Sequence, residues 1–222
     1  MCVTSYFEDA HTLVNHCESK IDFLRKLHAR CLADHAIKPE FQVELKNFVE
    51  NLRSALDYCA RGLFEKYGRS KTATPKIYFP YAKRGDNRGR FRDEIVERCI
   101  PGILSSRPDI VDHLETYQFF GASGNWLPLL MDITNEHKHE QLTPQLAKNY
   151  KVVEITATVP AGRTLEIDLK RIPLGGGPDQ PVRANTFAWS GFEFTTTGVV
   201  VMWFLETTLP NVADVVRELS KL

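Results

Sequence analysis

Two long helical stripes in the first third of the chain constrain its fold more than any other feature. In the first stripe, apolar side chains and histidines recur at spacings of three and four residues, at Val14, Cys17, Ile21, Leu24, His28, Cys31 and His35. This period places them on one face of a single helix. Ser5 and Glu8 precede the stripe as an S-x-x-E capping box, which is typical of a helix start.

A second helix of similar length follows after a short turn. Pro39 suits the first position of a helix, and Gly68 suits the position after its end. Between them the apolar stripe consists of Phe41, Leu45, Phe48, Leu52, Ala55, Cys59 and Leu63. Because the connection is short, the sequence predicts a long antiparallel helical hairpin as the spine of the fold.

The rest of the chain changes character twice. Residues 69–92 have the composition of a loop, and shorter helices are expected near 91–100, 108–118 and 125–140. From about residue 150 the apolar period becomes two, which predicts strands at 153–159, 165–169, 187–195 and 199–206, followed by a final helix from Asn211. We therefore predict an α+β fold. Its parts are a helical bundle domain, 1–148, and a small four-stranded antiparallel sheet with a C-terminal helix, 149–222, packed together as one unit.

Charge and cysteine content narrow the classes of function. The 28 basic and 28 acidic residues cancel, so any contact with RNA has to be local. The five cysteines form no C-x-x-C pair and fall on helical stripes, as expected of thiols in a reducing compartment. Glu8 and Asp9 stand where a signal peptide is basic or apolar, and the longest apolar run, 198–205, has eight residues. We expect a cytoplasmic protein without a membrane segment.

A polar cluster is the first candidate site. Asn135 and His139 are four residues apart and share a helix face, with Lys138 beside them. Arg53 and Asp57, one turn apart on the second long helix, are the expected partners across the interface. His139 has the chemistry of a general base for a ribose hydroxyl, and Arg53 or Lys138 that of a cation for the charged phosphorane. The alternative is a buried hydrogen-bonded network that fixes how two helices cross.

A basic segment at 83–92 is the second candidate site. Its basic residues are Lys83, Arg84, Arg88, Arg90 and Arg92, and Phe91 lies among them. Cationic and aromatic side chains together suit phosphate contact and base stacking. The alternative is a solvated surface loop.

Metal sites are expected neither on the E-x-x-H steps at 8–11 and 136–139 nor on the stripe residues His28, Cys31 and His35. A di-metal bundle site needs further carboxylates that the sequence does not offer, and a stripe position is more often a core position. We expect no metal and no cofactor.

Four segments carry a resemblance to a widespread bacterial family of uncharacterised function. They are N-L-R-S-A-L-D at 51–57, F-P at 79–80, the region of Tyr117, and N-E-H-K-H at 135–139. The family pattern is N-L-R-x-A-L-D-H, F-P, a Q-P-Y-like step and N-x-D-K-H-R. The chain departs from it at Tyr58, His137 and Glu140, which stand for His, Asp and Arg.

The helical part is also similar to the HEPN superfamily, many of whose members are metal-independent ribonucleases of toxin and phage-defence systems. That signature has an Arg four to six residues before its His, and Thr134 stands where the Arg is expected. The resemblance implies RNA binding or metal-independent RNA cleavage in a stress or phage-defence system.

The alternative function is a non-catalytic protein–protein interaction or oligomerisation module, with a homodimer formed through the long helical hairpin. The sequence leaves open whether the protein is an enzyme.

Overall fold

A computed structural model of the chain describes residues 5–70, 72, 74–121, 124–139, 145–156, 183–195 and 197–222, and of residues 136–139, 145–156 and 183–190 it describes the backbone alone. Contacts divide the chain into two units, one formed by 1–146 with 192–222 and the other by 147–191. Each unit is described by itself.

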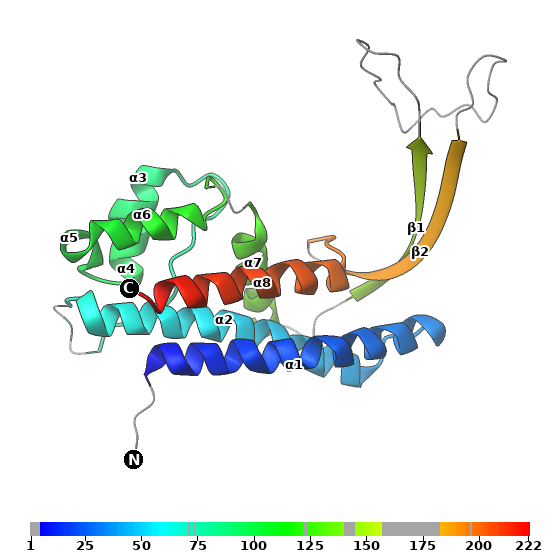
Figure 1. Ribbon diagram of the computed structural model, residues 1–222, viewed down its shortest axis with the longest axis horizontal. Helices are drawn as coiled ribbons and strands as arrows, with labels where there is room; N and C mark the ends of the chain where they lie inside the picture. The colour runs from blue at the N-terminus through cyan, green and yellow to red at the C-terminus, as the bar shows by residue number, and fades with distance from the viewer. Residues whose placement is uncertain are drawn as a thin grey trace, which may run out of the picture. The chain divides into compact units, whose positions relative to one another are not determined.

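Helices α1 (Tyr6–Ala33) and α2 (Pro39–Tyr67) are the two arms of the predicted hairpin (Figure 1). The capping box is formed, because Ser5 Oγ accepts from the Glu8 backbone N–H at 3.3 Å and Glu8 Oε2 accepts from the Ser5 N–H at 2.7 Å. Pro39 is the first residue of α2 as predicted. His35 lies beyond the end of α1, is exposed and has a φ of 50°, so it is not part of the buried stripe.

The third long helix is α8 (Val201–Leu219), where the sequence was interpreted as a strand at 199–206 and a helix from Asn211. Its buried residues, Val201, Phe204, Leu205 and Thr208, follow the helical period. The β-branched and aromatic composition of this stretch misled the prediction, because packing overrides strand propensity. Pro210 lies on the exposed side of α8. Proline has no N–H for the carbonyl one turn earlier, and on this side of the helix the loss does not fall in the hydrophobic core.

The predicted four-stranded sheet is wrong, because the protein is mainly helical. In the parts of 145–195 that the structure describes, two strands, β1 (Gln145–Thr156) and β2 (Arg183–Phe194), pair as one two-stranded sheet and run in opposite directions (Figure 1). The strand expected at 165–169 falls outside the described residues. The C-terminal helix, α8, packs on α1, α2 and α7 instead of on a sheet.

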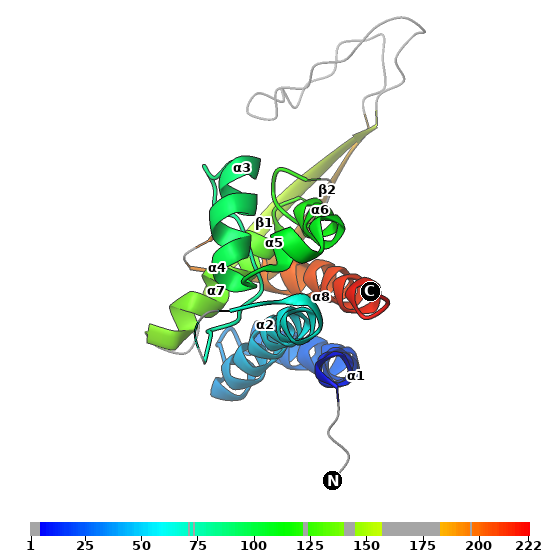
Figure 2. The same cartoon turned by 90° about the vertical axis from the view of Figure 1, so that its left-hand side faces the viewer.

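Shorter helices occupy the three places where helices were predicted. The first is continuous through α3 (Arg88–Arg90), a π-helical turn η1 (Phe91–Val96) and α4 (Glu97–Cys99). After α5 (Ile103–Ser106) come α6 (Pro108–Thr116) and α7 (Trp126–His139). In the two views of Figures 1 and 2, the helices α3 to α6 lie on the side of α2 and α8 that is opposite α1.

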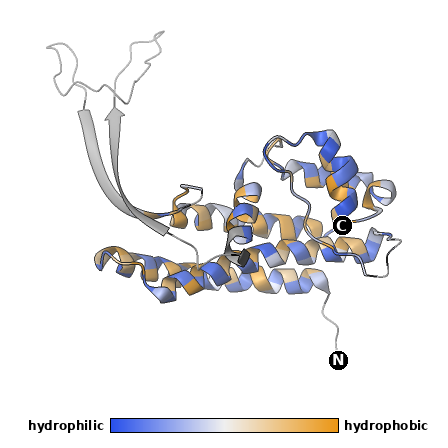
Figure 3. Cartoon of the chain, turned by 180° about the vertical axis from the view of Figure 1, so that it is seen from behind, coloured by the Kyte–Doolittle hydropathy of each residue, from blue (hydrophilic) through white to orange (hydrophobic). Residues whose placement is uncertain are grey.

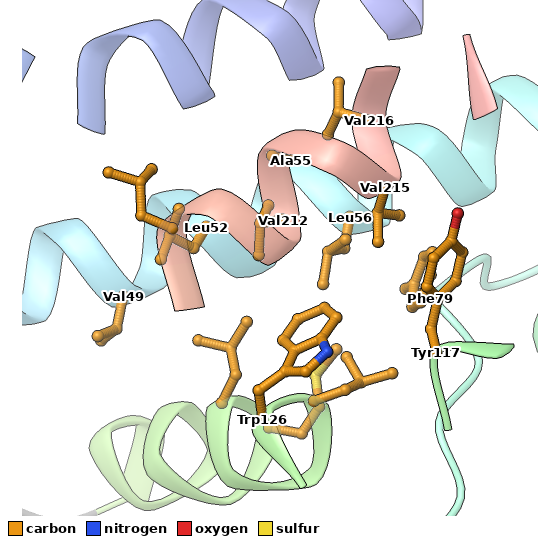
Figure 4. Packing of buried hydrophobic residues seen from close by; sticks show 14 of the residues in the cluster. Val49, Leu52, Ala55, Leu56, Phe79, Tyr117, Trp126, Val212, Val215 and Val216 are labelled. Carbon is orange, nitrogen blue, oxygen red and sulfur yellow. The ribbon is translucent and has the colours of Figure 1, made fainter. Parts of the chain in front are cut away.

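One hydrophobic core joins α1, α2, α7 and α8. Figure 4 shows the Trp126 ring pointing from α7 toward Leu56 of α2 and Val212 of α8, and all three residues are buried. Figure 3 shows hydrophobic and hydrophilic residues on different sides of the same helices, as amphipathic packing requires. Burial raises the pKa of the Cys17 and Cys59 thiols to about 12, so both are inert structural residues.

Candidate functional site

Arg53 links α2 to α7 at the predicted polar cluster. Its Nη1 donates to Asn135 Oδ1 at 2.6 Å and to Thr134 Oγ1 at 2.9 Å. Its Nε lies 3.9 Å from Asp57 Oδ2, within range of an ion pair but beyond a hydrogen bond. The Arg53 side chain is only 14% exposed. The guanidinium therefore acts as a clamp between two helices and is turned away from solvent.

Asp57 and Asn135 both hold the segment 79–84, which leads into the basic residues. Asp57 Oδ1 accepts from the Phe79 backbone N–H at 2.8 Å. Asn135 Nδ2 donates to the Tyr81 hydroxyl at 3.3 Å. The structure thus brings Arg53, Asp57 and Asn135 together, and their joint effect is to fix the position of Tyr81.

Gln118 is a third anchor of this segment that the sequence analysis missed. It is fully buried just after α6. Its Oε1 accepts from the Ala82 N–H at 2.8 Å, and its Nε2 donates to the Leu114 carbonyl at 3.0 Å and the Pro80 carbonyl at 3.3 Å. The Q-P-Y-like step of the family pattern, which the analysis placed at Tyr117, was the available signal.

A cavity of about 420 Å³ opens beside the anchored segment. We call it the basic cavity, and its lining residues are Tyr81, Lys83, Arg84, Asn125, Pro128, Leu129, Asp132 and Thr197. Lys83, Arg84 and Asp132 are exposed, so two cations and one carboxylate face solvent at this cavity. Among the described residues, neither Lys83 nor Arg84 forms an ion pair with a carboxylate. The volume of the basic cavity falls within the range of about 300–1,000 Å³ that is usual for ligand sites.

The other three predicted RNA-binding residues differ from Lys83 and Arg84. Arg90 pairs with Asp86 at 2.7 Å and with Glu94 at 3.3 Å, so carboxylates offset its charge. Arg92 likewise pairs with Asp112 and Glu115. Arg88 places its guanidinium 5.9 Å from the centre of the Phe120 ring.

Phe91, expected to stack on bases, is fully buried and packs on Phe120. The cationic surface is therefore smaller than the sequence suggested and centres on the basic cavity.

His139 and Lys138 complete the list of predicted catalytic residues. The backbone of both belongs to α7, and their side chains lie outside the described part of the chain. Their catalytic role stays a prediction.

The described side chains that could hold a metal lie apart or make other contacts. Within the described residues, no group of three histidine, cysteine or carboxylate side chains could hold a metal ion. His28 packs against the Phe41 and Phe192 rings, and Cys31 Sγ accepts from the Lys38 N–H. Glu8 is engaged in the capping box, and His11 contacts Ser220.

The basic cavity brings two cations, one carboxylate and the Tyr81 side chain together, and of the side chains that hold the neighbouring segment Gln118 is fully buried and Arg53 largely so. Among the described helices, none is long and apolar enough to cross a membrane. No protein-family model, no curated protein and no solved structure matches the chain.

Proposed function

We propose that this protein binds single-stranded RNA in the cytoplasm through the basic cavity. The observation that carries the proposal is the placement of Lys83 and Arg84 at a cavity whose wall, Tyr81, is fixed by a hydrogen bond from Asn135. Cations without carboxylate partners suit phosphates, and an anchored tyrosine keeps its ring in one place. The net charge of zero limits binding to this local surface.

In this proposal the polar cluster positions the binding site. Arg53 fixes Asn135, Asn135 fixes Tyr81, and Asp57 fixes the start of the same segment. Because Arg53 is largely buried and already donates two hydrogen bonds, it supports the proposed binding surface from behind.

The test is a titration of a fluorescent single-stranded RNA followed by anisotropy at about 0.1 M salt. Lys83→Ala combined with Arg84→Ala should weaken binding roughly tenfold and reduce the salt slope, because phosphate contacts release counterions. The matched control combines Lys46→Ala with Arg61→Ala, which removes the same charge from α2, where the two residues pair with Glu50 and Glu65. Equal weakening in both double variants would contradict the proposal.

Two further arms identify the ligand and test for cleavage. Competition by free mononucleotide at the same nucleotide concentration should be weak if the ligand is a strand and strong if it is a single nucleotide. Gel analysis of the RNA after incubation in EDTA, with wild type and His139→Ala, tests the predicted metal-independent ribonuclease reaction. If the RNA stays intact with wild type, the protein binds RNA without this ribonuclease activity.

A second candidate function is a homodimer through the helical hairpin, favoured by an aromatic surface at one end of it. Tyr58 is 38% exposed and stacks on Tyr6, with ring centres 6.3 Å apart, and Arg61 lies 5.9 Å from the Tyr6 ring. Exposed aromatic and arginine side chains are common in interfaces. Light scattering of wild type and Tyr58→Glu tests it: a dimer that becomes a monomer supports the hairpin interface, and a monomeric wild type excludes it.

A further inference from the structure

Two more hollows lie near the start of α7, and each shares lining residues with its neighbour. The first, of about 220 Å³, shares Asn125 and Leu129 with the basic cavity and is also lined by Trp126, Trp203, Phe204, Thr207 and Asn211. We call it the aromatic hollow. The second, of about 250 Å³, shares Trp126 and Asn211 with the aromatic hollow and is lined by Asp214 and Glu218. We call it the acidic hollow.

Trp203 is unusual for a residue of α8. It is 57% exposed, the largest exposure among the large hydrophobic side chains of the described residues, whereas its neighbour Phe204 is buried. An indole ring held on a helix at the rim of a hollow is a flat surface available to another ring.

Trp126 provides a second and independent observation. The residue is only 7% exposed, and its indole Nε1 is buried with no hydrogen-bond partner among the described residues. A buried donor without a partner costs free energy. An acceptor on a ligand that reaches this N–H would remove the cost.

Asn211 adds a hydrogen-bond acceptor to the Trp126 donor. Its Nδ2 donates to the Thr207 carbonyl at 2.7 Å, which leaves its Oδ1 as the side of the amide that can accept from a ligand. Trp126 and Asn211 both line the aromatic hollow, and an indole donor with an amide acceptor suits a planar ring that carries both acceptors and donors on its edge, as every nucleobase does.

Charge fixes the orientation of such a ligand. Lys83 and Arg84 line the basic cavity on one side of the aromatic hollow's shared residues, whereas Asp214 and Glu218 line the acidic hollow. The Tyr117 hydroxyl donates to Glu218 at 2.6 Å, which holds the pKa of that carboxyl below its usual range and keeps it charged at neutral pH. A phosphate backbone is therefore attracted to the first side and repelled from the second.

We infer that the aromatic hollow is a nucleobase subsite, in which one base of the strand stacks on Trp203 while its phosphate contacts Lys83 and Arg84. The inference rests on the RNA binding proposed above and names the part of the strand that enters the neighbouring hollow. A protein segment docked on Trp203 is the competing occupant.

The experiment compares two ligands, a single-stranded RNA and an abasic ribose-phosphate strand of the same length, by anisotropy. Trp203→Ala should weaken RNA binding roughly tenfold and leave the abasic strand unchanged, because only a base can stack. Trp203→Phe should restore most of the RNA affinity. Lys83→Ala with Arg84→Ala should weaken both ligands alike. Because Trp203 is exposed, its replacement leaves the core intact.

The outcomes separate the two proposals. If wild type binds RNA through Lys83 and Arg84 but Trp203→Ala binds it equally well, the nucleobase subsite is wrong and the hollow is left to a protein partner. If Trp203→Ala weakens both ligands equally, stacking is again excluded. If wild type binds neither ligand, the RNA proposal fails and the subsite fails with it.

Discussion

The α1–α2 hairpin and the segment 79–84 are built on different principles. The hairpin is held by apolar side chains that recur with the helical period along two continuous stretches. The segment is held by side chains that come from 22, 36 and 54 residues away, namely Asp57, Gln118 and Asn135. The comparison teaches that the scaffold depends on burial, whereas the proposed binding surface depends on a few polar side chains.

The largest expected effect is on the stability of the helical hairpin, from a substitution that should not change the proposed RNA-binding surface. Leu52 is fully buried on α2 and belongs to the same hydrophobic core as Val212 of α8 (Figure 4). Leu52→Ala should lower the free energy of unfolding by about 2–5 kcal/mol, through lost burial and the cavity left behind. Chemical denaturation followed by circular dichroism measures this. RNA affinity of the folded variant should stay unchanged.

The control is Val43→Ala on the same helix. Val43 is 43% exposed, so the change should stay within about 0.5 kcal/mol. Comparable losses in both variants would show that burial at Leu52 does not dominate the hairpin.

A smaller stability effect with a larger binding effect is expected at Gln118. Gln118→Ala leaves the Ala82 N–H and the Pro80 carbonyl without their partner in a buried place, so about 1–3 kcal/mol should be lost. Because Tyr81 and Lys83 flank Ala82, RNA affinity should fall as well. Denaturation and anisotropy measure the two effects.

Gln42→Ala, on α2 and away from the cavity, is the control and should change neither quantity. If Gln118→Ala loses stability but binds RNA like wild type, the anchored segment and the binding surface are not coupled.

This contrast explains what could be predicted from the sequence. The capping box at Ser5 and the proline at Pro39 are local signals, and the structure has both where they were expected. The strand predicted at 199–206 is wrong from Val201 onward, because α1, α2 and α7 cover the helical face of α8, whereas Val200 does pair with Glu193 in a single antiparallel bridge.

The candidate site shows the same division. Arg53, Asp57 and Asn135 could be paired from their helix faces, since residues three or four apart share a face. The contacts of Gln118 and the hollows lined by Trp126 could not, because they depend on how distant segments pack. The ion pairs of Arg92 with Asp112 and Glu115 were out of reach for the same reason. Those of Arg90 join residues four apart, Asp86 and Glu94, and were a local signal that the sequence analysis did not use.

The smallest expected effect is a change in the pH dependence of stability at His28 in the helical hairpin. His28 packs against the Phe41 and Phe192 rings, and its burial lowers the pKa of its imidazole below the usual 6.5. As pH falls below about 6.5 the unfolded chain takes up a proton at this residue while the folded chain stays neutral. The unfolded state then binds more protons, so stability falls as pH falls.

His28→Gln should remove this contribution, so the difference in unfolding free energy between wild type and variant should change in favour of the variant from pH 7.5 to pH 5.5. Urea denaturation at several pH values measures it, with His16→Gln, an exposed residue of the same helix, as the control. Parallel pH profiles for wild type and His28→Gln would mean that the imidazole titrates equally in both states. In that case the packing against Phe41 and Phe192 would admit a charged ring, and this part of the hairpin would resemble the polar segment more than the apolar scaffold.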